Sequence, residues 1–311
     1  MNGEAGASAR ETGAGAHGEV VRYYDQAAVD YRLAWHHPDA PAYHFGFHDA
    51  EHPGHRAALA NFNRVLADLA GVRPGDRVLD AGCGLGGTAL WLALERGASV
   101  CGITLVPSEV RRARDHARRR GISGRVRFEL ADFTDTPFAD SRFDVAWALE
   151  SLCHAPRKAA FYREMARLLR PGGRLVVGEY IRVRRPAEAI DEALLREWFE
   201  GWAIADLDTR EEHEAAAAAA GFTDIEVLDV TERTRPSHAR LYRRACVARP
   251  IDWLLHGCRL RTPVQHGNVI AALRQYQALR RGLWFYGIVR ATRPNARPGR
   301  SGAAPGGEGC G

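Results

Sequence analysis

The glycines of Val78–Gly87 have a spacing that points directly to chemistry. Gly82, Gly84 and Gly87 match G-x-G-x-x-G, in which small residues let the backbone approach the pyrophosphate of a dinucleotide. The same ten residues, VLDAGCGLGG, also match D-x-G-x-G-x-G, beginning at Asp80. Two classes of cofactor therefore compete for this loop.

The residues that follow the loop distinguish the two classes. A dinucleotide site needs an acidic residue at the end of the second strand, for the ribose hydroxyls. Here that strand ends in Thr104 and Leu105. S-adenosylmethionine (SAM) has no phosphate and needs an adenine slot instead. Asp132 could accept a hydrogen bond from the adenine amine, while the adjacent ring of Phe133 packs on the base. The pattern favours SAM.

Two further carboxylates complete the predicted cofactor site. Asp80 would orient the glycine loop or the methionine ammonium group, and Glu109, one turn into the next helix, could accept ribose hydroxyls. Simpler roles remain open for each residue. Asp80 could be a turn residue without a ligand, and Glu109 a carboxylate that favours the helix dipole. Asp132 and Phe133 could form an ordinary loop at a strand end.

Alternating apolar runs and helical patterns predict the elements that position these residues. Expected strands are 77–81, 99–105, 125–130, 143–149 and 174–180, with helices at 87–97, 107–120 and 158–169 between them. This order predicts an α/β fold with a doubly wound, mostly parallel sheet, whose ligands bind at the carboxyl ends of the strands. Beyond Tyr180 we expect helices at 187–201 and 209–220, a strand at 224–231, two helices within 237–281 and a closing strand at 283–293.

Composition divides the chain into five predicted parts. They are a disordered leader (1–18), an N-terminal helical lid (19–60), a SAM-binding core (61–182), a substrate cap with closing strands (183–293) and a disordered tail (294–311). The core and its cap form one main domain, because 311 residues with 46% hydrophobic content can bury a single large core.

Several motifs together resemble class I SAM-dependent methyltransferases. VLDAGCGLGG, ADFTDTPF, FDVAWALESLCHAP and RLLRPGGRLVVGEY occur in the order typical of that family, over about residues 74–182. GITLVPSEVRRAR is similar to a segment of sterol and tocopherol C-methyltransferases, although Glu109 replaces their usual Gln. ALESLCHAP and YYDQAAVDYRLAWHHPDAPAYHFGF also resemble sterol C-methyltransferases. Terpenoid methyltransferases share this branch, including the teleocidin-pathway type, in which methylation triggers cyclisation.

The resemblance implies a seven-stranded Rossmann-like fold, SAM as methyl donor and S-adenosylhomocysteine as product. An oxygen or amine acceptor then needs one general base, whereas an alkene acceptor forms a carbocation that aromatics or carboxylates must shield. Candidate catalytic residues lie at the carboxyl ends of the fourth and fifth strands. Glu150, which also borders the cofactor, and His154 follow the fourth strand, and Glu179 and Tyr180 end the fifth. Beyond about residue 185 we find little specific similarity, so the acceptor is poorly constrained.

The N-terminal segment is rich in aromatic residues and has the spacing of a helix with one apolar face. The side chains expected to contact the substrate, together with His154, are Tyr23, Tyr24, Tyr31, His44, Phe45 and Phe47. We expect this segment to form a lid over the acceptor. Ordinary packing against the sheet is the alternative for each of these residues, and a homo-oligomer that shares the lid is also left open.

Three functional hypotheses follow. The first is C-methylation of an isoprenoid or terpenoid alkene in natural-product biosynthesis, with or without cyclisation. The second is O- or N-methylation of a phenol, sugar or amine. The third is a SAM-binding protein without catalysis, or a nicotinamide enzyme. Intact Asp80, Asp132 and Glu150 argue against the non-catalytic version.

The resemblance implies a small hydrophobic substrate, and composition argues against several other partners. The formal charge of +5 comes from arginines spread along the chain, and the one dense run, Arg111–Arg120, has the spacing of a solvated helix face, which argues against nucleic acid. The six cysteines lack metal-site spacing, so we expect no metal and reduced thiols, mostly buried. No apolar run approaches roughly 18 residues, so we expect a cytoplasmic protein without stable membrane insertion.

Overall fold

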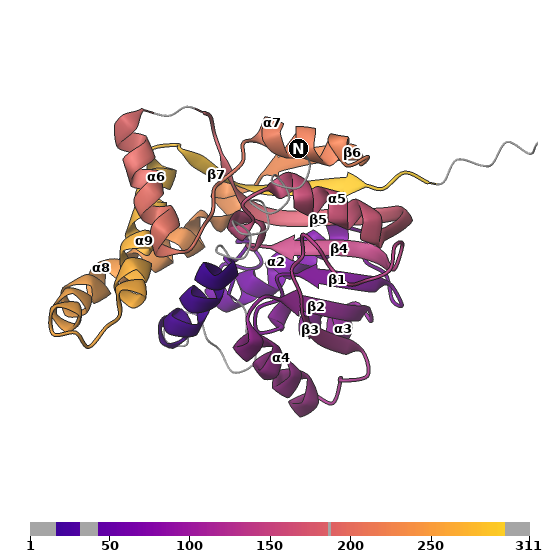
Figure 1. The fold of residues 1–311 in the computed structure, drawn as a ribbon, viewed down its shortest axis with the longest axis horizontal. Helices are drawn as coiled ribbons and strands as arrows, with labels where there is room; N and C mark the ends of the chain where they lie inside the picture. The colour runs from indigo at the N-terminus through magenta and orange to yellow at the C-terminus, as the bar shows by residue number, and fades with distance from the viewer. Residues whose placement is uncertain (1–16, 32–42, 186–187, 296–311) are drawn as a thin grey trace, which may run out of the picture.

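The computed structural model describes residues 17–31, 43–185 and 188–295 (Figure 1). The predicted disorder of residues 1–16 and 296–311 lies outside these ranges. His17 and Gly18 belong to a helix over residues 17–31, so the predicted leader is two residues too long.

A seven-stranded sheet forms the centre of the molecule, as expected. Its strands are β1 (Arg77–Ala81), β2 (Ser99–Thr104), β3 (Val126–Leu130), β4 (Phe143–Leu149), β5 (Leu169–Arg182), β6 (Thr223–Asp229) and β7 (Trp284–Thr292). They are arranged in the order β3-β2-β1-β4-β5-β7-β6. The first five strands pair in parallel, and β7 lies antiparallel between β5 and β6. The doubly wound, mostly parallel fold is confirmed.

Helices cover both faces of the sheet because successive strand side chains point in opposite directions. Val78 and Val145 pack in the same apolar cluster as residues of α2 (His55–Leu69), α3 (Gly87–Glu95) and α4 (Pro107–Arg119). Their neighbours Leu79 and Ala146 face the other way. These pack in a second cluster with residues of α5 (Lys158–Leu168) and α7 (Arg210–Ala219).

Three helices gather at one end of the sheet and form the expected cap (Figure 1). They are α6 (Ala189–Gly201), α8 (Thr231–Gly257) and α9 (Pro263–Arg280). The largest differences from the predicted bounds are at α8, which begins six residues earlier than expected, and at β5, which begins at Leu169 instead of residue 174; β6 ends at Asp229 instead of residue 231. The predicted helical region begins after Pro236, but α8 contains Pro236 together with Pro250. Packing on α9 and β7 outweighs the cost of the two missing amide donors.

The glycine loop between β1 and α3 is constrained by a close approach as well as by its backbone. Gly82 has φ +92°, and a Cβ atom there would lie 2.2 Å from the Cβ of Ser151. Gly75 has a similar φ of +86°, but a Cβ atom there would meet nothing within 4 Å. The two positions therefore share the same backbone strain, but only Gly82 lacks room for a Cβ atom.

We expect Gly82→Ala to lower the free energy of unfolding by about 1–3 kcal/mol more than Gly75→Ala, because only the former overpacks its surroundings. Urea denaturation of both variants measures the difference. Equal losses in the two variants would show that backbone conformation alone requires glycine at Gly82.

Candidate active site

The loop after β1 brings backbone close to the carboxyl edge of the sheet. Gly82, Gly84 and Gly86 all adopt positive φ. The amides of Gly82 and Cys83 both donate to the carbonyl of Ile103, at 2.9 Å each, which ties the loop to the end of β2. This turn leaves room for a ligand above the strands, where parallel α/β sheets bind theirs.

A cavity lies beside this loop, and we call it the glycine-loop cavity. All nine residues expected at the cofactor line it: Asp80, Gly82, Gly84, Thr104, Leu105, Glu109, Asp132, Phe133 and Glu150. They come from five separate segments of the chain, so the strand order assembles the cavity. Their individual contacts with a cofactor stay a prediction.

Two buried carboxyl groups give the glycine-loop cavity an unusual charge state. Burial raises the pKa of Asp80 to about 7 and that of Glu109 to about 7. Glu109 accepts a hydrogen bond from the Thr104 hydroxyl at 2.8 Å. The Oδ2 atom of Asp80 is buried without a hydrogen-bond partner. Because a buried polar atom without a partner is unfavourable, Asp80 is suited to a ligand that donates to it or carries positive charge.

The predicted adenine slot is partly occupied by protein contacts. The Oδ1 atom of Asp132 accepts from the backbone amide and the hydroxyl of Thr134, at 2.7 and 2.8 Å. Its Oδ2 atom lies 3.0 Å from Nε2 of His17, which reaches across from the N-terminal helix. The ring of Phe133 is buried and packs edge-on against Phe161. The slot is therefore already preordered before a base enters it.

A second cavity adjoins the first and is lined mainly by apolar and aromatic side chains; we call it the apolar cavity. Its walls come from the N-terminal segment, from β5 and from the cap helices. They include Tyr31, Phe45, Tyr180, Trp202, Ile204, Leu241, Ala245, Ile251, Leu255, Val269 and Ala272. Tyr24, Tyr43, Glu150 and His154 line both cavities, so these four residues mark the junction.

Glu150 is the most constrained of the junction residues. It follows β4 with φ +52°, a conformation that is unfavourable for a residue with a side chain. Its Oε1 accepts from the amide of Phe45 and the hydroxyl of Tyr286, both at 2.7 Å. Its Oε2 accepts from the hydroxyl of Tyr180 at 2.8 Å. Burial raises the pKa of Glu150 to about 8, although the three hydrogen bonds oppose that shift.

His154 lies on the short helix η1 (Leu152–His154), one turn beyond Glu150. Its Nδ1 is 2.8 Å from the carbonyl of Ala203 and must carry a proton, since a carbonyl only accepts. Burial lowers the pKa of His154 to about 4, so the ring is neutral and Nε2 has a free electron pair. Nε2 lies 3.0 Å from the hydroxyl of Tyr24, which therefore donates to it.

The helix over residues 17–31 spans the two cavities and is attached at both ends. Asp30 forms a bidentate ion pair with Arg261 near the start of α9, at 2.9 and 2.8 Å. The hydroxyl of Tyr23 donates to Asn268 at 3.0 Å. Nearer the middle of the helix, Asp25 accepts from Ser108 on α4 at 2.7 Å, and at its start Nε2 of His17 lies 3.0 Å from Asp132. The helix therefore bridges the core and the cap, in the position expected of a lid.

Four of the seven side chains expected at the substrate line the apolar cavity: Tyr24, Tyr31, Phe45 and His154. The other three do not. His44 lines the glycine-loop cavity instead. Tyr23 is buried between Tyr31 and Asn268, and Phe47 packs against Phe62 of α2. For Tyr23 and Phe47 we correct the expected placement, because helix packing turns their rings away from both cavities.

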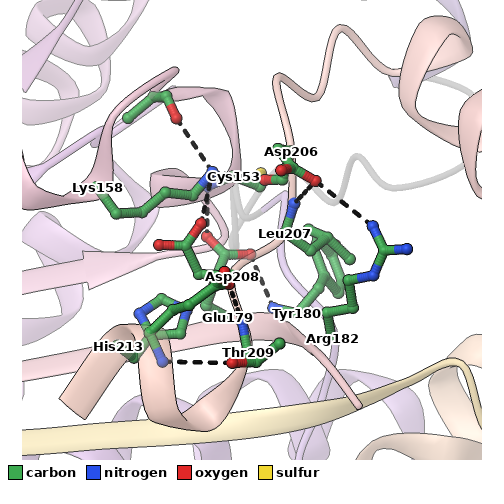
Figure 2. Close-up of polar contacts among 12 residues, drawn as sticks. Cys153, Lys158, Glu179, Tyr180, Arg182, Asp206, Leu207, Asp208, Thr209 and His213 are labelled. Carbon is green, nitrogen blue, oxygen red and sulfur yellow. Dashed lines mark hydrogen bonds and ion pairs between the residues drawn. The ribbon is translucent and has the colours of Figure 1, made fainter. Parts of the chain in front are cut away.

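Glu179 is the one expected catalytic residue that lines neither cavity. Its carboxylate accepts from the backbone amides of Cys153 and Tyr180, at 2.8 Å each (Figure 2). It therefore lies beneath η1, and we correct its expected position beside the acceptor. Burial raises the pKa of Glu179 to about 7, while Lys158 opposes the shift.

Lys158, the chain's one lysine, is buried in the same network (Figure 2). Its ammonium group donates to the carbonyl of Ala155 at 3.0 Å and to that of Asp206 at 2.5 Å, and lies 3.9 Å from a carboxylate oxygen of Asp208. These bonds fasten the segment just after η1 to the chain that follows α6. Lys158 and Glu179 thus hold the turn bearing Glu150 and His154 from below.

The sequence analysis missed Tyr286, Tyr43 and Trp202. Tyr286 lies on β7 directly opposite Tyr180 in the antiparallel register, which brings both hydroxyls to Glu150. A closing strand was predicted there, but its register beside β5 had no local signal. Tyr43 lay within the quoted N-terminal motif and could have been included with its neighbours.

Within the described residues, no three or more His, Cys, Asp or Glu side chains are arranged to hold a metal ion. No helix in those ranges combines the length and apolar character that crossing a bilayer requires. Of the described cysteines, Cys83, Cys101 and Cys153 are buried. Cys246, within α8, and Cys258, just after its last residue, are exposed.

Comparisons with known proteins agree with this geometry. A methyltransferase domain model matches residues 79–177. The 27-O-demethylrifamycin SV methyltransferase of Amycolatopsis mediterranei (strain S699) is 39% identical over 204 residues, covering 65% of this chain and 74% of that protein. The 24-methylenesterol C-methyltransferase 2 of Oryza sativa subsp. japonica is 37% identical over 164 residues, 52% of this chain and 43% of that protein. The solved [4+2]-cyclase SpnF superposes with a TM-score of 0.74 and 26% identity, covering 89% of this chain and 96% of that one.

The network beneath η1 predicts a pH-dependent loss of stability. Lys158→Met should lower the free energy of unfolding by roughly 3–5 kcal/mol, because it removes the buried ammonium group that pairs with Asp208 and favours the charged form of Glu179. The folded-state pKa of Glu179, already above its usual value, would rise further. An elevated folded pKa means that stability falls as pH rises towards that pKa, so the loss should be larger at pH 9 than at pH 6.

The matched control is the double variant Lys158→Met/Glu179→Gln, which removes both charges while keeping the shape of the side chain at Glu179. Denaturation at both pH values should show a smaller and less pH-dependent loss than in Lys158→Met. A double variant that loses the full sum of the two single effects would argue that the two residues are not coupled.

Proposed function

We propose that this chain, which belongs to the SAM-dependent methyltransferase family, methylates an alkene carbon of a small lipophilic acceptor of the isoprenoid class. The family assignment removes the nicotinamide hypothesis. The acceptor and the atom that is methylated are the proposed part, and they rest on the residues around Glu150.

The residues of the glycine-loop cavity fit SAM. Asp80 has an oxygen without a partner, which suits an ammonium donor, and Gly82 and Gly84 line the cavity without a side chain, so a ligand can approach their backbone. Asp132 and Glu109 would hold the adenine amine and the ribose hydroxyls. When bound, SAM supplies an electrophilic methyl group on a positively charged sulfur.

The observation that carries the proposal is the buried carboxyl of Glu150 at the junction of the two cavities, between Tyr180 and Tyr286. An alkene that takes up a methyl group donates its π electrons to the new carbon–carbon bond, and the donor sulfur keeps the pair of the broken bond. The acceptor is then a carbocation. Carboxylates and aromatic faces stabilise such a cation, and the carboxylate can remove the proton that restores a double bond.

The walls of the apolar cavity support the same chemistry. Tyr24, Tyr31, Tyr43 and Phe45 contribute aromatic rings near Glu150, and the cap contributes aliphatic side chains farther out. Such a lining excludes water, which would otherwise capture a carbocation. The similarity to a sterol C-methyltransferase points in the same direction.

O-methylation is the second candidate, because His154 could act as the general base that it requires. Its Nε2 is unprotonated and faces the junction, where it could take the proton of an acceptor hydroxyl in place of that of Tyr24. The 27-O-demethylrifamycin SV methyltransferase, at 39% identity, favours this alternative by its name.

Two matched variants distinguish the candidates. Glu150→Gln keeps the shape of the side chain and removes its charge, whereas His154→Asn retains a donor for Ala203 and removes Nε2. If the acceptor is an alkene, Glu150→Gln should lower kcat by about 100-fold or more with little change in SAM affinity, and His154→Asn should have a much smaller effect.

The assay uses methyl-labelled SAM with a panel of prenyl alkenes, phenols and hydroxylated macrocycles. Product mass and carbon NMR identify the methylated atom and any new ring. If the new methyl carbon is bonded to oxygen, and kcat falls more in His154→Asn than in Glu150→Gln, the proposal is wrong and the enzyme is an O-methyltransferase.

The raised carboxyl pKa values predict proton release when SAM binds. Asp80, Glu109 and Glu150 have pKa values of about 7, 7 and 8, so a large part of this group is protonated at pH 7. A sulfonium charge favours the carboxylates, so SAM binding should release about one proton and tighten as pH rises from 6 to 8. S-adenosylhomocysteine, whose sulfur is neutral, should release fewer protons.

Calorimetry in two buffers of different ionisation enthalpy measures the released protons. Glu150→Gln is the control and should reduce the release for SAM more than for S-adenosylhomocysteine. Equal proton release by the two ligands, or an affinity for SAM that does not change between pH 6 and 8, would refute the coupling.

A further inference from the structure

Large apolar side chains are exposed together on the outer half of α8 and on the turn that follows it. Val247, Ile251, Trp253, Leu254 and Leu260 are between 59% and 77% exposed. They make up half of the exposed large apolar side chains in the described residues, yet fall within fourteen consecutive positions. Single exposed apolar residues are ordinary, but a cluster of this kind marks a contact surface. We call these five residues the α8 patch.

The cluster has an orderly arrangement on the helix. Val247, Ile251 and Leu254 are spaced i, i+4 and i+7, so they form one stripe along α8. Trp253 lies beside that stripe on α8, and Leu260 lies in the turn that follows the helix. In Figure 1 the turn between α8 and α9 lies at the outer end of the cap, away from the sheet.

The same segment is strongly basic. Residues 240–261 contain six arginines and a single acidic residue, Asp252. Asp252 is buried and forms ion pairs with Arg261, at 2.5 Å, and with His266, at 2.6 Å. Arg243, Arg249 and Arg259 are exposed. Within residues 240–261, therefore, the exposed charged side chains are all arginines.

The α8 patch is continuous with the apolar cavity. Ile251 belongs to both, since it lines the cavity and is 63% exposed. Ala248 and Leu255, on the adjacent side of α8, also line the cavity. The apolar surface therefore extends from the outside of the molecule to the junction at Glu150.

We propose that the α8 patch docks on an anionic lipid surface, from which a lipophilic acceptor enters the apolar cavity past Ile251; the second half of this statement rests on the proposed function. Apolar side chains with a tryptophan, flanked by arginines, are suited to the boundary between lipid headgroups and acyl chains. A second copy of the chain fits less well, because a two-fold contact through this surface would bring its arginines together.

Flotation of the full chain with vesicles tests docking without reference to activity. Vesicles of phosphatidylglycerol should carry the protein at low salt, vesicles of phosphatidylcholine should carry much less, and added salt should release it. Trp253→Ser/Leu254→Ser should lower the partition coefficient by about tenfold or more. Leu94→Ser, which changes an exposed leucine on α3, is the matched control and should bind like the unmodified chain.

The exposed thiol of Cys246 gives a second readout from within α8. In a Cys258→Ser/Cys310→Ser background, an environment-sensitive dye on Cys246 should shift to the blue with phosphatidylglycerol vesicles. The proposal is overturned if the chain does not bind these vesicles, or if the double serine variant binds them as well as Leu94→Ser does. It is also overturned if sedimentation shows an oligomer that the double variant dissociates while no vesicles bind.

Activity separates this proposal from the function on which its second half rests. With an acceptor delivered in phosphatidylglycerol vesicles, the double variant should lose about tenfold in kcat/KM, whereas with the same acceptor dispersed in detergent it should match the unmodified chain. Equal activity of both proteins in vesicles would refute the entry route. If no isoprenoid is methylated in either form, the proposed function fails while the flotation result stands.

Discussion

A carboxyl group buried among aromatic and apolar side chains is the constraint on which the site depends. Burial opposes ionisation of Glu150, and three hydrogen-bond donors favour it. Those donors belong to Phe45 in the N-terminal segment, Tyr180 on β5 and Tyr286 on β7. None of the three is local to Glu150, so the group is satisfied only when the lid segment, the parallel sheet and the antiparallel strand have all assembled.

The antiparallel β7 has a chemical as well as a topological consequence. A parallel strand in the same place would have needed a crossover connection, whereas β7 returns beside β5 after the cap helices. Its register places Tyr286 opposite Tyr180, and both hydroxyls reach the same carboxylate. Two of the three cap helices, α8 and α9, are inserted between β6 and β7, so helices that line the apolar cavity lead directly into the strand that completes the Glu150 site.

Charge is distributed differently in the two halves of the molecule. No arginine or lysine lines the glycine-loop cavity in the described part of the chain, although arginine is abundant elsewhere. Its carboxyls are left without cationic partners, which suits a positively charged cofactor. On the cap, Arg261 joins the N-terminal helix to α8 through Asp30 and Asp252, and Arg243, Arg249 and Arg259 are exposed. The cap therefore both attaches the N-terminal helix and carries exposed arginines.

The sequence by itself predicted the sheet core, the glycine loop and nine of the residues that line the glycine-loop cavity, Glu150 among them, because these follow short motifs at the ends of predicted strands and parallel strands bring such ends to one edge. It also predicted that His154 lies near Glu150, and both line the junction of the two cavities. Only the tertiary structure decided what surrounds them. Tyr286 is 136 positions from Glu150 along the chain, and its place depends on the β5–β7 register. Glu179 lies next to Tyr180 on β5, but it points beneath the η1 turn, because adjacent residues of a strand face opposite sides of the sheet.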